Sequence, residues 1–342
     1  MEKLNRSFVL KLDKDPAKPK YQKLADSIVD NIESGNFNVN DKIPSVNQIS
    51  RELRISRETV FKAFETLSEK GIIKSSNRKG YYVNKTDVSL QLRVFMLLDK
   101  LTFFKEELFY AFQEEIKGKG EVDVFFHHHN YKVFESFVQE NLNSYTHFVV
   151  VTFLDRDISK ILLQIPSEKL VILDCYESKL QGHGSMIYQD FASNIKNALV
   201  ASLGRLRTYK RLYLVESGKR QYAQQTRKGF ISFAEESSFE CKVIEEVPKT
   251  NIRRGDVYLT HRTDDRDLVQ IIKTCRSKNL EIGKDVGLIS YNDSPIKEVL
   301  EGGITVISTD FSEMGRSAAR LILQRKKVIK AQPFELIRRN SL

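Results

Sequence analysis

Cysteine is scarce in this sequence: the 342 residues include only Cys175, Cys241 and Cys275, far apart along the chain. Their number is odd and no cysteine–cysteine or cysteine–histidine ligand spacing exists, so neither a disulfide framework nor a structural zinc site is expected. Long apolar runs are absent too. None reaches the roughly 18 residues that span a bilayer, and the first residues hold no apolar segment of signal-peptide length. We therefore expect no membrane contact and a reduced, cytoplasmic location.

The sequence also lacks the signatures of common enzyme classes. There is no Gly-x-Gly-x-x-Gly after a predicted strand, no Walker A run, no Gly-x-Ser-x-Gly and no His-Glu-x-x-His. The placement of Asp, Glu and His suggests no nucleophile–base pair. An enzyme is therefore not favoured, and no cofactor is expected.

The run His127-His128-His129 ends a predicted strand and invites a metal hypothesis. Adjacent side chains on a strand point to opposite faces, so at most two of the three could share a face. No carboxylate or cysteine lies at ligand spacing from them, and a metal site is not expected here.

What the chain does contain is an ordinary globular composition with an uneven distribution of charge. Hydrophobic residues make up 41% and charged residues 29%, enough for a sizeable core in two or three domains. The net charge is +10, and the first 84 residues hold 16 Lys and Arg against 11 Asp and Glu. This segment is about three times more basic per residue than the rest, which favours a polyanionic partner without separating DNA from RNA or a membrane.

Helical periodicity begins at Tyr21 and predicts three helices before residue 72. Gly35 and Gly71 would end the first and third helices, while Ser45 and Ser56 would cap the second and third. The apolar residues expected to form the three buried stripes are Tyr21, Leu24, Ala25, Ile28 and Ile32; Val46, Ile49 and Leu53; and Val60, Ala63, Phe64 and Leu67.

Two short β runs, 72–74 and 81–83, follow around a polar, basic tip and predict a hairpin. The order of helix, helix, turn, helix and hairpin is typical of a winged helix-turn-helix domain. We assign this domain to residues 1–84 and a linker to residues 85–92.

Strands and helices alternate over residues 93–342, which predicts parallel sheets covered on both faces. Two sets of such units favour two doubly wound α/β lobes with a cleft between them, so the fold class is α/β overall. The predicted strands are 94–98, 122–126, 148–153, 170–173, 211–215, 257–260, 287–290 and 305–308. The predicted helices are 104–117, 132–142, 192–203, 223–236, 266–278 and 312–325.

The start of the third predicted helix carries side chains suited to DNA. The first residues of the second helix of a helix-turn-helix motif enter the major groove. There Arg57 can read a guanine edge or clamp a phosphate, and short hydroxyls and backbone N–H groups favour phosphates. The candidates from this reasoning are Ser56, Arg57, Glu58 and Thr59, with Lys62 farther along and Arg78, Lys79 and Gly80 at the hairpin tip.

Residues 19–83 resemble the GntR family of bacterial repressors, through segments 21–24, 32–35, 41–45, 56–60, 67–73 and 79–83. The resemblance implies that Ser45, Ser56, Arg57, Thr59 and the hairpin tip face a double-stranded DNA operator. One position departs from the family, which usually has a DNA-contacting arginine two residues after the serine of its Pro-Ser motif. Here that position is Asn47, which can still read adenine or hold a phosphate, so the preferred operator can differ from the family norm.

Another polar group follows the predicted strand that begins at Gly287. Ligands of open α/β sheets bind beyond the carboxyl ends of the strands, where Asn292 or Asp293 could bond sugar hydroxyls. The alternative is a turn built on the Asn-Asp pair. Segments 227–230, 287–293, 305–311, 313–319 and 333–339 resemble the LacI family and the periplasmic sugar-binding proteins, closely over 285–339 and more loosely over 93–284.

This second resemblance implies a set of ligand residues. Arg227 would grip ligand hydroxyls or a carboxylate, Phe311 would lie against an apolar sugar face, and Asn292 replaces a frequent ligand-binding Asp. The remaining candidates are Asp99, Phe104, Asp190, Thr263 and Asp264. Asp190 and Asp264 have the alternative role of helix N-caps.

Both resemblances together predict a homodimeric repressor of carbohydrate use, with a monosaccharide or sugar derivative as effector. The combination of domains is similar to that of the arabinose repressors of Gram-positive bacteria. The alternatives are a sugar-responsive activator, a constitutive architectural DNA-binding protein, which the second domain argues against, and an enzyme.

Overall fold

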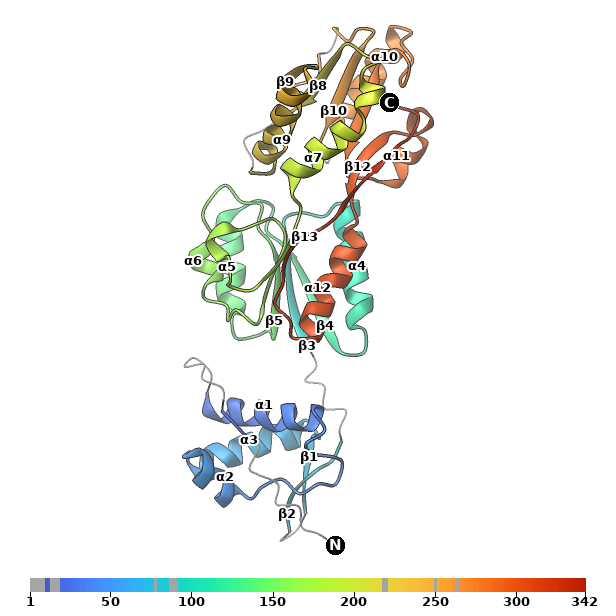
Figure 1. Cartoon of the computed structure of the whole chain (residues 1–342). Coiled ribbons are helices and arrows are strands. Elements are labelled where there is room, and N and C mark those ends of the chain that lie inside the picture. Colours follow the sequence, from blue (N-terminus) through green and yellow to red (C-terminus); the bar gives the residue numbers. More distant parts are fainter. Residues whose placement is uncertain are drawn as a thin grey trace. The chain divides into compact units, whose positions relative to one another are not determined.

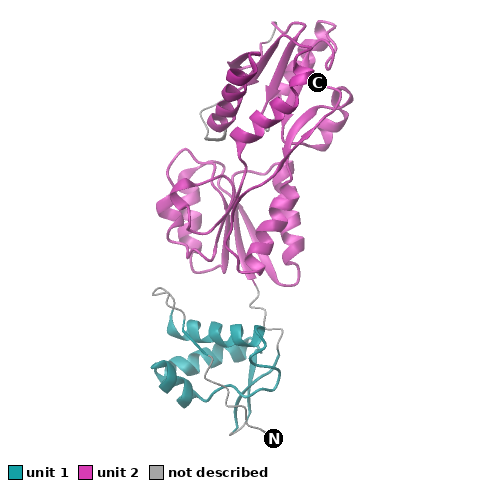
Figure 2. Cartoon of the chain, viewed as in Figure 1, with its two compact units in different colours: residues 1–91 teal, residues 92–342 magenta. Residues whose placement is uncertain are grey.

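The computed structural model describes residues 10–12, 19–76, 79–85, 92–216, 221–248, 251–261 and 265–342. The chain separates into two units, residues 1–91 and residues 92–342 (Figure 2). Within the described ranges, no helix is both long and apolar enough to cross a membrane.

The first unit is a winged helix-turn-helix, as the order of predicted elements indicated (Figure 1). Its strands form an antiparallel hairpin in which Ile73 faces Val83 and Ser76 faces Gly80. Arg54, at the end of the second helix, adopts a left-handed conformation with φ 52°, which turns the chain sharply into the third helix. The elements are α1 (Lys20–Glu33), α2 (Val46–Leu53), α3 (Arg57–Glu69), β1 (Ile73–Ser76) and β2 (Gly80–Val83).

The core of this unit is built from the predicted helix stripes. Leu24, Ile28, Ile49, Phe64 and Leu67 are fully or almost fully buried. Three residues at the edges of the stripes, in the first or last turn of their helices, pack against this core but are only partly buried: Tyr21, Val46 and Leu53.

The second unit holds two six-stranded sheets, each in its own lobe, and the predicted pair of doubly wound lobes is confirmed (Figure 1). In the first lobe the order is β13-β7-β6-β5-β3-β4, with every pair parallel. Its strands are β3 (Leu92–Leu98), β4 (Gly120–Phe126), β5 (His147–Val151), β6 (Leu170–Asp174), β7 (Ser185–Tyr188) and β13 (Ile329–Ala331). Its helices are α4 (Phe103–Ile116), α5 (Tyr131–Asn141), α6 (Ser159–Leu162) and α12 (Phe311–Leu323).

In the second lobe the order is β14-β12-β11-β10-β8-β9, parallel except for the antiparallel β14. Its strands are β8 (Arg211–Val215), β9 (Glu240–Ile244), β10 (Asp256–Thr260), β11 (Gly287–Tyr291), β12 (Thr305–Thr309) and β14 (Phe334–Ile337). Its helices are α7 (Phe191–Ala201), α8 (Leu203–Leu206), α9 (Gln221–Ser237), α10 (Arg266–Ser277) and α11 (Pro295–Val299).

The chain passes between the lobes three times: after β7, after β12, and between β13 and β14. The first and third crossings are tied together, because the backbone N–H of Gln332 donates to the Tyr188 carbonyl at 2.7 Å. The Gln332 side-chain nitrogen also reaches the Asp310 carbonyl at the second crossing, at 3.4 Å. The three crossings therefore lie side by side at the base of the cleft.

Helix α12 returns to the first lobe and packs along α4 (Figure 1). Met314 and Ala318 share one buried cluster with Leu108 and Phe112. The two helices approach so closely that a Cβ at Gly315 would lie 2.2 Å from the Leu108 carbonyl oxygen. Only glycine fits there.

Candidate functional site

The start of α3 is exposed and well capped. The Ser56 hydroxyl accepts a hydrogen bond from the Thr59 backbone N–H at 3.1 Å, and the two hydroxyls bond each other at 2.7 Å. Arg57 and Glu58 point into solvent. The other N–H groups of the first turn have no helical partner and can receive an anion such as phosphate.

Helix α2 begins in the same way. The Ser45 hydroxyl accepts from the Gln48 N–H at 3.2 Å, so the predicted cap is confirmed. Asn47 is exposed in the first turn of α2. Because it is exposed, a longer side chain can replace it without disturbing the core.

The basic residues farther from the start of α3 lie in two places. Lys62 is exposed, and its ammonium sits over the Tyr21 ring, 4.4 Å from the centroid. Lys79 and Gly80 are exposed at the hairpin, whereas Arg78 lies outside the described residues. Lys42 is close to Gly80, with its Cε 3.2 Å from the position that a Cβ would take there. Lys42 thus adds a basic group beside the hairpin that the sequence did not single out.

We expect Asn47→Arg to strengthen DNA binding or to shift the preferred sequence. The new guanidinium can contact one more phosphate in each half-site, which should steepen the log–log dependence of affinity on salt by about one unit per half-site. Gel-shift titrations at several salt concentrations measure this slope. If neither the slope nor the preferred sequence changes, Asn47 does not face DNA.

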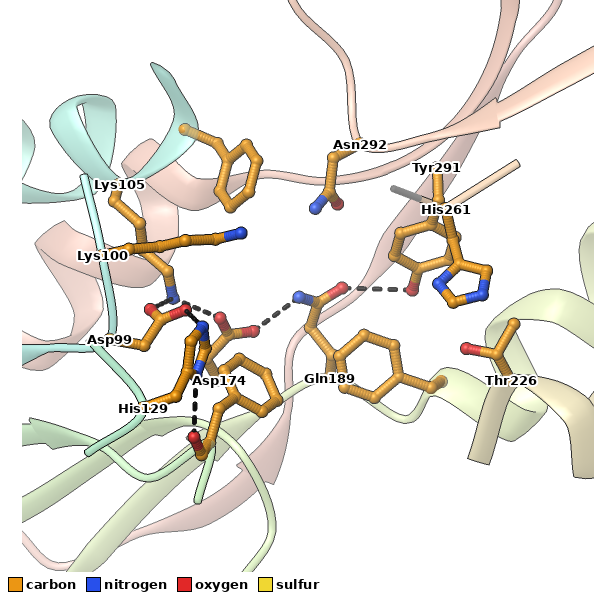
Figure 3. A pocket seen from close by; sticks show the side chains of 13 residues that line it. Asp99, Lys100, Lys105, His129, Asp174, Gln189, Thr226, His261, Tyr291 and Asn292 are labelled. Atoms are coloured by element: carbon orange, nitrogen blue, oxygen red, sulfur yellow. Dashed lines mark hydrogen bonds and ion pairs between the residues drawn. The ribbon is translucent and has the colours of Figure 1, made fainter. Parts of the chain in front are cut away.

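The second unit contains a cavity of about 490 Å³ lined by both lobes, which we call the main compartment (Figure 3). Most of its polar side chains lie at or just beyond the carboxyl ends of parallel strands, where α/β sheets bind ligands. The lining residues are Asp99, Lys100, Phe104, Lys105, His129, Phe153, Asp174 and Gln189 from the first lobe and its exit, and Phe191, Thr226, His261, Tyr291 and Asn292 from the second.

A buried group of charges forms one wall. Lys105 is 1% exposed and pairs with Asp174 and, at 3.6 Å, with Asp99. Burial alone would lower the pKa of Lys105, but the two carboxylates outweigh it and raise the pKa, so the ammonium stays charged. His129 lies 3.8 Å from the other oxygen of Asp99. Figure 3 shows Lys100 extending into the cavity beside this group.

Gln189, at the first crossing, joins this wall to the second lobe. Its side-chain nitrogen donates to Asp174 at 2.5 Å. Its oxygen accepts from the hydroxyls of Tyr291, at 3.1 Å, and Thr309, at 2.9 Å. One buried amide therefore connects strands β6, β11 and β12 across the base of the cleft.

Two buried oxygen atoms in the lining have no hydrogen-bond donor within the described structure. They are Oδ1 of Asn292, in the second lobe, and Oδ1 of Asp99, in the first lobe, which faces the Lys105 ammonium at 3.6 Å, beyond hydrogen-bonding distance. Asn292 follows β11 in a left-handed conformation with φ 57°. Because a buried acceptor without a donor is costly, the cavity favours a ligand that supplies donors on both sides.

A second compartment, of about 660 Å³, adjoins the first and shares Phe153, Gln189 and Phe191 with it. Asp190 lines this second compartment. Asp190 is also the N-cap of α7, since its carboxylate accepts from the Ser193 N–H at 3.1 Å and from the Ser193 hydroxyl at 2.8 Å. The N-cap alternative for Asp190 is thus confirmed.

The structure brings together only some of the predicted ligand residues. Asp99, Phe104 and Asn292 line the main compartment. Phe311 is 2% exposed and lies behind Phe104, with ring centroids 4.7 Å apart, so it supports the wall without lining it. Arg227 is exposed on α9 and lines neither compartment. Its ligand role stays a prediction, and so do those of Thr263 and Asp264, which lie outside the described residues.

The histidine run is held by the backbone. His127 is fully buried and its Nε2 lies 3.0 Å from the Val151 carbonyl, while Nδ1 of His129 lies 2.9 Å from the Phe153 carbonyl. The described residues contain no group of three potential metal-binding side chains. His127 and His129 anchor the loop after β4.

Burial lowers the pKa of His127 from 6.5 to about 4, because a charged ring would place a second N–H where no acceptor lies. In the unfolded chain His127 becomes protonated near pH 6.5, whereas in the folded protein it stays neutral until about pH 4. The folded state is therefore fully stabilised by this residue above pH 6.5 and loses that stabilisation as the pH falls from 6.5 towards 4. We expect about 2 kcal/mol less stability at pH 5 from this residue. Urea denaturation at pH 7 and pH 5 measures the loss. His127→Gln should reduce it, and an unchanged pH profile would contradict the assignment.

Comparison with known proteins agrees with both units. Residues 20–83 match the family model of bacterial regulatory proteins of the gntR family, and residues 206–342 match that of the periplasmic binding protein-like domain. The uncharacterized HTH-type transcriptional regulator YcxD of Bacillus subtilis is 32% identical over 66 residues, 19% of this chain. That match spans only 15% of the length of the relative.

Solved structures resemble the second unit in fold. A LacI family transcriptional regulator from Lactobacillus casei with bound glucose superposes with a TM-score of 0.59 at 14% identity, over 73% of this chain and 99% of that one. The probable maltose operon transcriptional repressor of Staphylococcus aureus gives a TM-score of 0.59 at 18% identity, over 74% of this chain and 98% of that one. Residues 20–83 thus match the gntR family of bacterial regulatory proteins and residues 206–342 a periplasmic binding protein-like domain, and the second unit shares its fold with solved LacI family regulators.

Proposed function

We propose that this protein is a cytoplasmic repressor of a carbohydrate-utilisation operon, released or retuned by a small sugar or sugar derivative in the cleft. As a homodimer it would hold a DNA operator through α2, α3 and the hairpin. The residues proposed to contact DNA are Ser45, Asn47, Ser56, Arg57, Glu58, Thr59, Lys62, Arg78, Lys79 and Gly80.

The observation that carries the effector assignment is the pair of buried acceptors, Asp99 Oδ1 and Asn292 Oδ1. A sugar has several hydroxyl groups that point in different directions, so one molecule can donate hydrogen bonds to both acceptors at once. Phe104, Phe153 and Phe191 supply the apolar surface against which a sugar ring packs. The solved LacI family regulator with bound glucose supports this type of ligand in the same fold.

Regulation would follow from the different affinities of the effector for two arrangements of the lobes. A ligand that bonds Asp99 and Asn292 together favours a closed cleft. A ligand shifts an equilibrium only by its differential affinity, typically about 1–3 kcal/mol for coupled sites. The sugar therefore needs to favour the arrangement that binds DNA poorly if it is to induce.

The test is calorimetric titration of the full-length protein and its Asn292→Gly variant with a panel of monosaccharides and disaccharides. Glycine keeps the left-handed backbone and removes the amide, so the affinity of any sugar that binds should fall about three- to tenfold. Asn279→Gly is the matched control, since Asn279 is exposed and also left-handed, with φ 51°. Binding of no sugar in the panel, or equal affinity in wild type and Asn292→Gly, would contradict the proposal.

The sign of regulation needs a second measurement. We expect the sugar that binds to weaken operator binding in a gel-shift titration. A sugar that strengthens operator binding would contradict sugar-induced release and favour a corepressor or an activator.

A further inference from the structure

The cleft does not end at the main compartment. It continues past Phe153 and Phe191, whose ring centroids lie 6.3 Å apart, into the second compartment. The two compartments share Phe153, Gln189 and Phe191 in their linings, so they adjoin. A ligand of one ring that bonds Asp99 and Asn292 would occupy the first and leave the second to water.

One wall of the second compartment is aromatic. The rings of Tyr176 and Tyr188 contact each other with centroids 4.9 Å apart, and both residues are only half-buried. Tyrosine offers a broad apolar ring together with a hydroxyl at its tip. Such a wall fits a ring that is apolar on its face and polar along its edge, as a sugar ring is.

The cysteine in the lining of the second compartment is unreactive. Cys175 is 4% exposed, and burial followed by the neighbouring carboxylates of Asp174 and Glu177 raises the pKa of its thiol well above the usual value. The thiol stays neutral and therefore unreactive as a nucleophile. It contributes a small, neutral side chain to the lining.

The lining of the second compartment also contains polar groups. Asp190 caps α7, but a carboxylate has about four acceptor positions, and the Ser193 contacts use only two of them. Gln225 is exposed on α9 and offers both a donor and an acceptor. These residues lie at and beyond the first crossing, whereas the tyrosines belong to the first lobe.

We propose that the effector is a two-ring carbohydrate, of the size of a disaccharide, whose rings occupy the two compartments. The first ring bonds Asp99 and Asn292, and the second packs against Tyr176 and Tyr188 and bonds Asp190 and Gln225. This inference rests on the proposed sugar response and specifies its ligand. A ligand of this length contacts both lobes on either side of Gln189, which increases its preference for one arrangement of the lobes.

The experiment compares monosaccharides with disaccharides that contain them, on the full-length protein: glucose with maltose and sucrose, and galactose with lactose. In calorimetric titrations we expect at least one disaccharide to bind about tenfold more tightly than its monosaccharide, as one or two added hydrogen bonds imply. Gln225→Trp fills the second compartment from an exposed position. It should remove this difference and leave the monosaccharide affinity within about twofold, since the main compartment is intact.

Glu235→Trp is the control, because Glu235 is exposed on the same helix and is absent from the described lining of both compartments. Tyr176→Phe, which keeps the ring, should retain most of the disaccharide affinity. If each disaccharide binds no better than its monosaccharide, or if Gln225→Trp leaves disaccharide affinity unchanged, the two-ring proposal is overturned while the sugar response stands. If no sugar of either size binds, the sugar response itself fails, and this inference with it.

Discussion

Lys105→Met lowers the free energy of unfolding by about 3–5 kcal/mol, because it leaves two buried carboxylates without their counter-ion. Asp174 and Asp99 flank the Lys105 ammonium and all three side chains are at most 6% exposed. Removing one partner from a buried ion pair is more costly than removing the pair, since the remaining charge stays buried without its counter-ion.

Urea denaturation of the full chain measures the loss. The double variant Lys105→Met/Asp174→Asn should recover much of it, because one of the stranded charges is gone. Lys284→Met is the control on an exposed pair with Glu281, and it should change stability by at most about 1 kcal/mol. Equal stability of Lys105→Met and wild type would show that the carboxylates do not depend on this ammonium.

Arg57→Ala should abolish specific operator binding while leaving the fold and the sugar affinity intact. Arg57 is exposed at the start of α3, the position from which a recognition helix reads bases. A lost bidentate base contact costs about 1–3 kcal/mol per half-site, and a dimer has two half-sites. In a symmetric dimer the loss in affinity is therefore large enough to remove a specific band from a gel shift.

The matched control is Lys70→Ala, which removes the same charge at the opposite end of the same helix. It should weaken binding much less than Arg57→Ala does. Sugar titration of both variants verifies that the second unit is unaffected. Unchanged operator affinity in Arg57→Ala would refute the assignment of α3 as the recognition helix.

The sequence predicted the elements with strong periodicity and missed those at the edges of sheets. All six predicted helices of the second unit and its eight predicted strands are present, with ends shifted by at most two residues. The missed strands are β7, β9, β13 and β14. Three of them are edge strands, and β13 is exposed at every residue. An edge strand is covered on fewer sides, so its apolar pattern is weak.

The sequence predicted where the cleft lies, but only some of the residues that line it. The rule that ligands bind beyond strand ends placed Asn292 in the lining, and the resemblance to sugar-binding proteins supplied Asp99 and Phe104. The same rule could have found His129, Gln189 and His261, which also follow strands. Lys105 gave no such signal, because a lysine on a helix is almost always exposed. Its burial depends on two carboxylates that follow different strands, and a single segment does not show that pairing.

Because the chain crosses between the lobes three times, each lobe is built from segments that are distant in sequence. This affects when each lobe can fold during synthesis. The face of α4 that carries Leu108 and Phe112 is covered by α12, about 200 residues farther along. Strand β13 completes the first sheet later still. As the ribosome delivers the chain from its N-terminus, the first lobe has an uncovered apolar face until nearly all of the second has emerged. Truncation before residue 311 should therefore yield an aggregation-prone fragment, whereas the unit of residues 1–91, whose core is local, is complete early in synthesis.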